Sequence, residues 1–187
     1  HLSIRRQRQM CIRDRYMFPK AHAAAYVMMA WRIAYCKIFY PLAYYAAFFS
    51  IRASAFSYEI MCQGRDKLEY YLADYKKRSD TLSKKEQDTL RDMRIVQEMY
   101  ARGFDFMPID IYKAKARHFQ IIDGKLMPSL SSIDGLGEKA AEAVVDAVKD
   151  GPFLSVEDFS SRTKVNGTIC SLMSDLGLLK DLPQSNQ

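Results

Sequence analysis

Apolar side chains recur every three or four residues along the first part of the chain, which is the spacing of one face of an α-helix. From Lys20 this face consists of small and flexible side chains: Ala21, Ala24, Ala25, Met28 and Met29. Proline lacks a backbone N–H and has a helical φ, so Pro41 predicts the end of this helix near Tyr40 and the first turn of another. The second helix, from Leu42 to about Phe49, is too apolar to face water, and we expect it to pack against other protein.

Two further helices are predicted with recognisable ends. The stretch DKLEYYLADYKK indicates a helix from Asp66 to Lys77 with one apolar face. Ser83 and Glu86 have the spacing of a capping box, so a charged helix begins there and runs to about Ala101. Gly103 is placed to end it, because glycine adopts the left-handed conformation of a helix C-terminus without steric cost.

The period changes to two between residues 107 and 127, which is typical of strands. Ile109 and Ile111 alternate with polar neighbours. Asp123-Gly124 is a turn signal for a β-hairpin, whose arms would be Gln120–Ile122 and Lys125–Met127. The fold class indicated is therefore mainly α with a small β-hairpin.

The most specific pattern is a pair of glycines around one leucine, directly before a helix of small residues. Gly135-Leu136-Gly137 is followed by EKAAEAVVDAVKD. Glycine adopts positive φ easily and lets another backbone approach closely. The first amide N–H groups of a helix have no internal partner and lie at the positive end of its dipole. A tight turn here therefore presents backbone donors suited to a phosphate group.

The residues around this turn match the helix-hairpin-helix pattern of an apolar residue, a spacer, Gly-Leu-Gly and then small residues. Ile133 precedes the turn, Lys139 can add a cation, and Ala140 begins the run of small residues. The alternative is an ordinary tight turn before a helix. The DNA-contact residues predicted from the pattern are Gly135, Leu136, Gly137, Glu138 and Lys139. Such contacts read no base, so binding would be independent of sequence and sensitive to salt.

A weaker second copy follows in KVNGTICSLMSDLGLL, with Val165-Asn166-Gly167 at the position of the turn and Gly177 at the end of the helix. Only one glycine is present in this turn. The copy either contacts phosphate through Asn166, Gly167 and Thr168 or serves only to pair with the first copy in a compact unit.

The net charge of +6 favours an anionic partner such as nucleic acid. Most of this charge lies in residues 1–15, HLSIRRQRQMCIRDR, which hold five arginines and one aspartate. This leader is either a basic arm that binds phosphate or a non-native or disordered end outside the fold, and we favour the second. Another group of cations is Lys76, Lys77, Lys84 and Lys85. That group either contacts DNA or forms a solvated surface, which is the commoner case for charged helical runs.

The four cysteines and three histidines are too scattered for a zinc site, so no metal site is predicted. Isolated thiols fit a reducing cytoplasm.

The apolar stretch from Ala23 to Phe49 is interrupted by Arg32, Lys37 and Pro41. A central Arg or Lys costs about 2.5–3.5 kcal/mol on membrane-insertion scales, so no membrane span is expected.

Taken together, these stretches resemble the C-terminal end of PolC-type DNA polymerase III alpha subunits, the replicative polymerases of low-GC Gram-positive bacteria. The resemblance covers Tyr16 to Gln187 and includes FPKAHA, PIDIY, LSSIDGLGEKAAEAVV, GPFLSVEDF and LPQSNQ. It implies a helical fingers segment followed by a tandem helix-hairpin-helix domain that holds primer-template DNA. After the leader at 1–15, the implied domains are the end of the fingers at 16–57, a helical connector at 58–106 and a duplex-binding domain at 107–187.

The resemblance also implies that cations of the fingers segment lie near the incoming deoxynucleoside triphosphate. These candidates are Lys20, His22, Arg32 and Arg52. A cation there is chemically sensible because the leaving pyrophosphate concentrates negative charge. The alternative is that they are surface charges and that His22 is a helix-start residue.

The family's palm carboxylates, which bind two Mg²⁺ ions for nucleotidyl transfer, lie upstream of the matching region. The chain is therefore expected to have no catalytic residue, to bind no cofactor and to be inactive alone, although the full-length enzyme uses Mg²⁺. The family continues past QSNQ with a segment that docks on the sliding clamp, whereas this chain ends at Gln187, so clamp binding is doubtful. The compartment implied is the cytoplasm.

Two other functions remain open: a free-standing helix-hairpin-helix DNA-binding module, and a subunit of a DNA repair nuclease. The first fifty residues discriminate among the three functions. A free module has no need of the apolar helices between Ala21 and Phe49, which must dock against something.

Overall fold

The computed structural model describes residues 20–185, so the leader predicted at residues 1–15 lies outside the described residues. The chain divides after Pro41 into two compact units. In the first unit the described residues form helix α2 (Lys20–Phe39), none of whose side chains is buried. Large apolar side chains are exposed on it, among them Trp31 at 73% and Ile38 at 64%. No helix within residues 20–185 is long and apolar enough to span a membrane.

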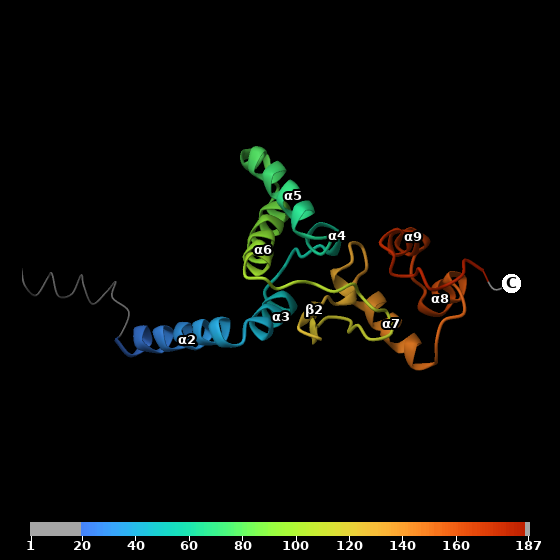
Figure 1. Cartoon of the computed structure of the whole chain (residues 1–187), viewed down its shortest axis with the longest axis horizontal. Helices are drawn as coiled ribbons and strands as arrows, with labels where there is room; N and C mark the ends of the chain where they lie inside the picture. The colour runs from blue at the N-terminus through green and yellow to red at the C-terminus, as the bar shows by residue number, and fades with distance from the viewer. Residues whose placement is uncertain (1–19, 186–187) are drawn as a thin grey trace, which may run out of the picture. The chain divides into compact units, whose positions relative to one another are not determined.

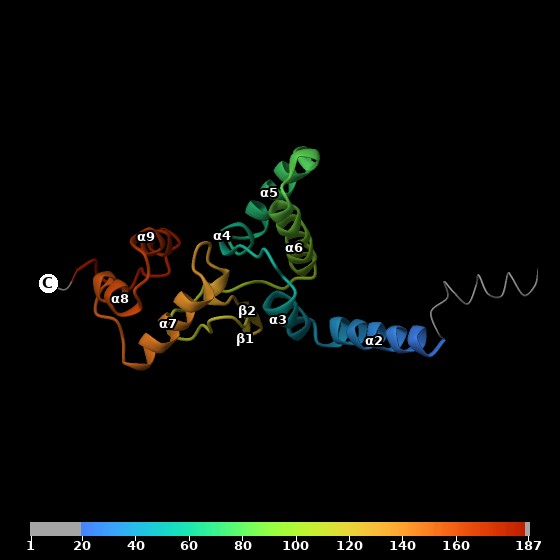
Figure 2. The same ribbon diagram turned by 180° about the vertical axis from the view of Figure 1, so that it is seen from behind.

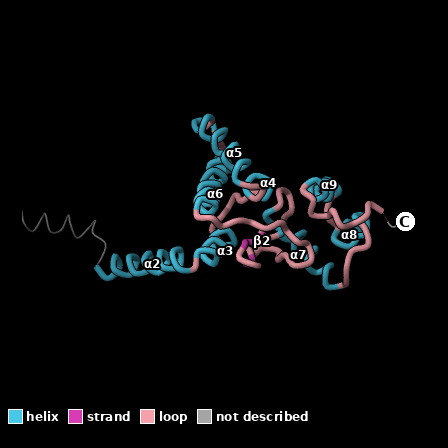
Figure 3. Tube along the Cα trace, viewed as in Figure 1, coloured by secondary structure: helices cyan, strands magenta, loops and turns pink. Residues whose placement is uncertain are grey.

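The second unit is mainly helical with one short β-hairpin, which confirms the predicted fold class (Figure 1, Figure 3). Its elements are α3 (Pro41–Ile51), α4 (Tyr58–Met61), α5 (Arg65–Lys77), the 3₁₀ turn η1 (Ser79–Thr81), α6 (Lys84–Ala101), β1 (Gln120–Ile122), β2 (Lys125–Met127), the 3₁₀ turn η2 (Leu130–Ser132), α7 (Glu138–Lys149), α8 (Val156–Thr163) and α9 (Gly167–Asp175). Helices α5 and α6 lie side by side and run in opposite directions (Figure 2).

The predicted helix boundaries are confirmed to within two residues, and several ends have a local cause. Pro41 is the first residue of α3, where its missing N–H is not needed. Ser83 and Glu86 form the capping box of α6: the Glu86 N–H donates to Ser83 Oγ over 3.3 Å, and the Ser83 N–H donates to Glu86 Oε2 over 2.8 Å. Gly103 follows this helix with a φ of 84°, which only glycine adopts easily.

The predicted β-hairpin is confirmed in both its arms and its turn. Strands β1 and β2 are antiparallel, with Ile121 paired to Leu126. Asp123 and Gly124 both have positive φ, 49° and 74°, as a type I′ turn requires.

The alternation predicted at Ile109 and Ile111 does not correspond to a strand. Both side chains are buried, but the backbone forms a turn at residues 111–113 and no strand. The C=O of Asp110 accepts hydrogen bonds from the N–H groups of Lys113 and Ala114. A turn therefore buries both isoleucines without a partner strand.

Two hydrophobic cores form in the second unit. The first joins α3, α5 and α6 to aromatic rings from later loops: Tyr45, Phe49, Leu68, Leu72, Met93, Val96, Met99, Phe106, Phe119 and Leu126. The second joins α7, α8 and α9 through Leu130, Ile133, Leu136, Val144, Phe159, Val165 and Met173, together with Met127. Successive side chains of a strand point to opposite faces, so Leu126 and Met127 of β2 serve different cores. The apolar helix α3 is thus packed within the chain itself.

We expect Ser83→Ala to lower the free energy of unfolding by about 1 kcal/mol, because the first turn of α6 loses its side-chain acceptor. Urea unfolding followed by far-UV circular dichroism measures this loss. Ser171→Ala is the control, since Ser171 is exposed on α9 and its side chain has no hydrogen bond in the described part of the chain. Equal stability of the two variants would contradict the capping assignment.

Candidate nucleic-acid interface

The first hairpin loop, residues 133–137, connects η2 to α7 and has the geometry that its sequence predicts. Gly135 has a φ of 84°, a conformation that strains other residues. Leu136 is 3% exposed and packs into the second core beside Ile133. The Leu136 N–H donates to the C=O of Ile133 over 3.1 Å. These contacts fix the loop and leave Gly137 exposed at the start of α7.

The N-terminus of α7 is left open by the residues around it. Four helices of the described region have a side-chain acceptor at the N-cap: Ser57 for α4, Ser83 for α6, Ser155 for α8 and Asn166 for α9. Gly137 takes this position in α7 and provides none. Within residues 20–185, no acceptor pairs with the backbone N–H groups of Gly137, Glu138 or Lys139. Unpaired donors at the positive end of a helix dipole can bind an anion.

The backbone of Gly137 does not itself require glycine. Its φ of −65° and ψ of 161° nearly equal the −63° and 162° of Ser83, the capping residue of α6. A Cβ atom on Gly137 would meet nothing within 4 Å. By contrast Gly64, which precedes α5 without a side-chain cap, has a φ of 97° that disfavours other residues. The missing side chain at Gly137 therefore leaves both donors and space available to an external ligand.

The second hairpin loop, residues 162–166, joins α8 to α9 and repeats the geometry one residue earlier than the sequence indicates. The last three residues of this loop, Lys164, Val165 and Asn166, correspond to Gly135, Leu136 and Gly137 of the first loop. Lys164 has a positive φ of 56°, as the first glycine does. Val165 is 4% exposed in the second core, like the leucine. Asn166 is the N-cap, like the second glycine.

The N-terminus of α9 is closed by this asparagine. Asn166 Oδ1 accepts a hydrogen bond from the Thr168 N–H over 3.1 Å, and its C=O accepts one from the Ile169 N–H over 2.9 Å. Among the predicted contacts of this copy, the N–H of Gly167 remains unpaired within residues 20–185. Lys164 is missed by sequence reasoning, because a lysine at the left-handed position does not resemble the glycine pattern.

Known proteins are similar to the chain over almost its whole length. A family model described as "Helix-hairpin-helix motif" matches residues 103–187. The chain is 44% identical over 180 residues to "DNA polymerase III PolC-type" of Listeria monocytogenes serovar 1/2a, and 44% identical over 177 residues to that of Staphylococcus haemolyticus. The chain is homologous to one segment of PolC-type DNA polymerase III.

The PolC-type relative from Caldanaerobacter subterraneus subsp. tengcongensis is 40% identical over 179 residues. These alignments include 95–96% of the chain but only 12–13% of each relative. The chain therefore spans about an eighth of the length of the curated relatives it matches.

In this chain, Glu138 is paired with a cation from a distant loop. Arg117 Nη2 lies 2.7 Å from Glu138 Oε2 and 3.4 Å from Glu142 Oε1. The carboxylate of Glu138 would repel an anion at the N-terminus of α7, and Arg117 offsets this charge. Lys139 is exposed and forms no ion pair with the residues that the structure describes, so its cation is available to a ligand. No pattern in the sequence indicates the pairing with Arg117.

The cations predicted near a nucleotide belong to both units of the chain. Lys20, His22 and Arg32 are exposed on α2, where the His22 ring meets Tyr26 edge-on with centroids 4.5 Å apart. Arg52 is exposed directly after α3. A role near the triphosphate stays a prediction for all four.

We expect Lys164→Gly to stabilise the fold and to weaken binding to duplex DNA. A left-handed φ costs a residue with a Cβ atom roughly 1–2 kcal/mol, and glycine recovers part of this cost. The lost cation would make the salt dependence of binding less steep by about 0.9 for one phosphate contact. Urea unfolding and fluorescence anisotropy at several salt concentrations measure the two effects. The control is Lys180→Ala, an exposed cation outside both hairpin loops. Binding equal to that of the control would exclude a phosphate contact by Lys164.

Proposed function

We propose that this chain holds the primer-template duplex in a PolC-type replicative polymerase through sequence-independent contacts with the sugar-phosphate backbone. The open N-terminus of α7 carries the proposal: the N–H groups of Gly137, Glu138 and Lys139 are unpaired within residues 20–185, and the Lys139 side chain is exposed. Such a site suits a phosphate. The homology with PolC-type DNA polymerase III points to DNA as the source of that phosphate.

Backbone amides suit this task because a replicative polymerase has to hold every sequence it copies. Phosphate contacts fix the register of a protein on DNA and carry no sequence information. Their contribution comes largely from released counterions, so affinity falls as salt rises. The second hairpin loop would add Lys164 and the Gly167 N–H, and the Asn166 cap leaves it fewer free donors than the first.

We extend the proposal to the domains that the resemblance implies: the fingers end at 16–57, the connector at 58–106 and the duplex-binding domain at 107–187. Helix α3 shares the first core with α5 and α6, so the boundary at residue 57 would separate functions within one folding unit. Helix α2 exposes large apolar side chains, which is typical of a surface that another part of the protein covers. The rest of a polymerase of the relatives' length can supply that cover.

Within the polymerase, Lys20, His22, Arg32 and Arg52 would lie near the incoming deoxynucleoside triphosphate and offset its charge. Nucleotidyl transfer itself would occur elsewhere. No three His, Cys, Asp or Glu side chains gather as metal ligands within residues 20–185. We propose that the isolated chain binds duplex DNA and transfers no nucleotide. The cytoplasm of a bacterium is the compartment in which such a polymerase works.

The decisive variant is Gly137→Ser. Because the backbone at Gly137 nearly matches that of Ser83, the new hydroxyl can cap α7 and occupy donors that otherwise face the phosphate. We expect the free energy of unfolding to rise by a few tenths of a kcal/mol or stay equal. Affinity for duplex DNA should fall roughly ten- to a hundredfold, since hydrogen bonds to a charged group contribute about 1.5–3 kcal/mol.

Fluorescence anisotropy with the full chain and two labelled duplexes of unrelated sequence tests the proposal. The parent chain should bind both duplexes with equal affinity, which should fall steeply between about 50 and 200 mM salt. Ala73→Ser is the control, because it adds the same hydroxyl at an exposed position of α5 that lies outside both hairpin loops. No binding by the parent chain, or equal losses in both variants, would refute the proposed role of α7.

A further inference from the structure

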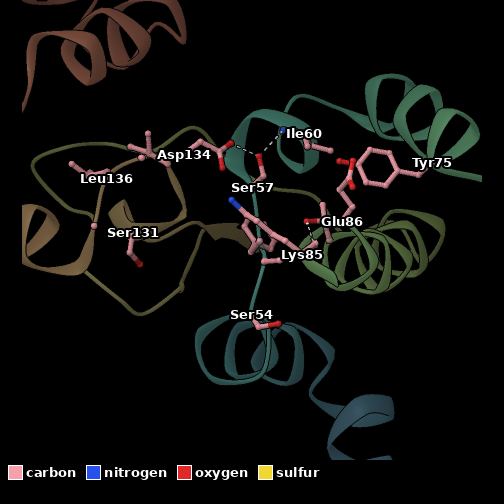
Figure 4. Close-up of a pocket in the computed structure, with 15 residues that line it drawn as sticks. Ser54, Ser57, Ile60, Tyr75, Lys85, Glu86, Ser131, Asp134 and Leu136 are labelled. Atoms are coloured by element: carbon pink, nitrogen blue, oxygen red, sulfur yellow. Dashed lines mark hydrogen bonds between the residues drawn. The ribbon is translucent and has the colours of Figure 1, made fainter. Parts of the chain in front are cut away.

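A cleft of about 630 Å³ lies between the first hairpin loop and the start of α6 (Figure 4). The cleft is lined by Ser54 to Ser57, by Asp134 to Gly137 of the loop, and by Lys85, Glu86 and Thr89 of α6. The cleft lies within the second unit of the chain. It therefore places a lysine of the connector opposite the loop that precedes α7.

The two carboxylates of the cleft are already bound to groups of the chain. Glu86 accepts hydrogen bonds from the hydroxyl and the backbone N–H of Ser83, and these bonds lower the pKa of its carboxyl group. Its Oε1 atom also lies 3.6 Å from Arg78 Nη1. The hydroxyl of Ser57 donates to Asp134 and accepts from the Ile60 N–H. These local contacts reduce the repulsion that either carboxylate would exert on an anion.

Lys85 differs from these carboxylates in having no partner. Its side chain is exposed, and its ammonium pairs with no residue in the range 20–185. Figure 4 shows the side chain extending from α6 into the cleft, toward the side that holds Ser57 and the hairpin loop. The cleft thus has an unpaired cation on one side and the uncapped Gly137 on the other.

We propose that Lys85 binds a second backbone phosphate of the duplex whose first phosphate occupies the N-terminus of α7. The inference rests on the proposed function, since it takes the same DNA as the ligand. An ammonium is a point charge that attracts phosphate without reading a base. Of the connector lysines Lys76, Lys77, Lys84 and Lys85, only Lys85 would then contact DNA, and the other three would form a solvated surface.

Lys84 provides a matched control. It lies next to Lys85 in the first turn of α6, is exposed, and does not line the cleft. Replacing either lysine with alanine removes one positive charge from the same helix end. A difference between the two variants therefore reports the position of the cation and not the net charge of the chain.

The experiment is fluorescence anisotropy of the full chain with a labelled duplex between about 50 and 200 mM salt. Lys85→Ala should weaken binding roughly three- to tenfold and make the slope of log affinity against log salt about 0.9 less steep. Lys84→Ala should leave the slope nearly unchanged, and Lys85→Arg should restore it. Far-UV circular dichroism checks that each variant is folded.

Equal effects of Lys84→Ala and Lys85→Ala, or an unchanged slope in Lys85→Ala, would overturn the inference while leaving duplex binding by α7 intact. This result would be clearest if Gly137→Ser lost affinity while Lys85→Ala kept the salt dependence of the parent chain. Failure of the parent chain to bind any duplex would instead refute the proposed function, and the inference with it.

Discussion

The proposed DNA binding depends on one unsatisfied structural requirement: the first N–H groups of α7 have no acceptor within the residues described. Four other helices in residues 20–185 meet this requirement with a serine or asparagine side chain. At α7 the capping position is Gly137, although its backbone would accept a serine and its Cβ position is empty. A glycine at the capping position costs roughly a few tenths of a kcal/mol of stability relative to serine. A phosphate from DNA would provide the missing acceptor, which connects this cost to the proposed function.

The rest of the fold holds this helix end in place. Leu136 anchors the loop in the second core, and Gly135 permits the turn that brings it there. The hydroxyl of Ser57 ties Asp134 to the start of α4, so the loop is also bound to the connector. Leu126 and Met127 then join the two cores through adjacent residues of one strand. The open amides and the helix that carries Lys85 thus belong to one compact unit of the chain.

The sequence predicts those features that depend on neighbouring residues. Pro41, the Ser83 capping box and the Asp123-Gly124 turn each act through local backbone chemistry, and the structure confirms all three. The first hairpin loop is predicted for the same reason. Ile109 and Ile111 show the limit, because alternation also arises when a turn buries two side chains in a core.

The sequence pattern does not predict features that depend on residues far apart in the chain. The left-handed Lys164 is recognisable only once Val165 is seen to occupy the core position of Leu136. The pairing of Arg117 with Glu138 joins two loops that no spacing rule connects. Lys85 and Lys84 are equivalent in sequence, and only the cleft distinguishes them. The sequence therefore predicts the first hairpin loop of the candidate interface but not the contributions of Lys164, Arg117 and Lys85.

The most direct test of the central claim is a titration of the ¹⁵N-labelled chain with duplex DNA, followed by the backbone amide resonances. Phosphate binding at α7 predicts large downfield proton shifts for Gly137, Glu138 and Lys139, because their N–H groups gain a charged acceptor. The Thr168 amide, already bonded to Asn166, should shift much less. Saturable binding that leaves the three α7 amides unchanged would contradict the account.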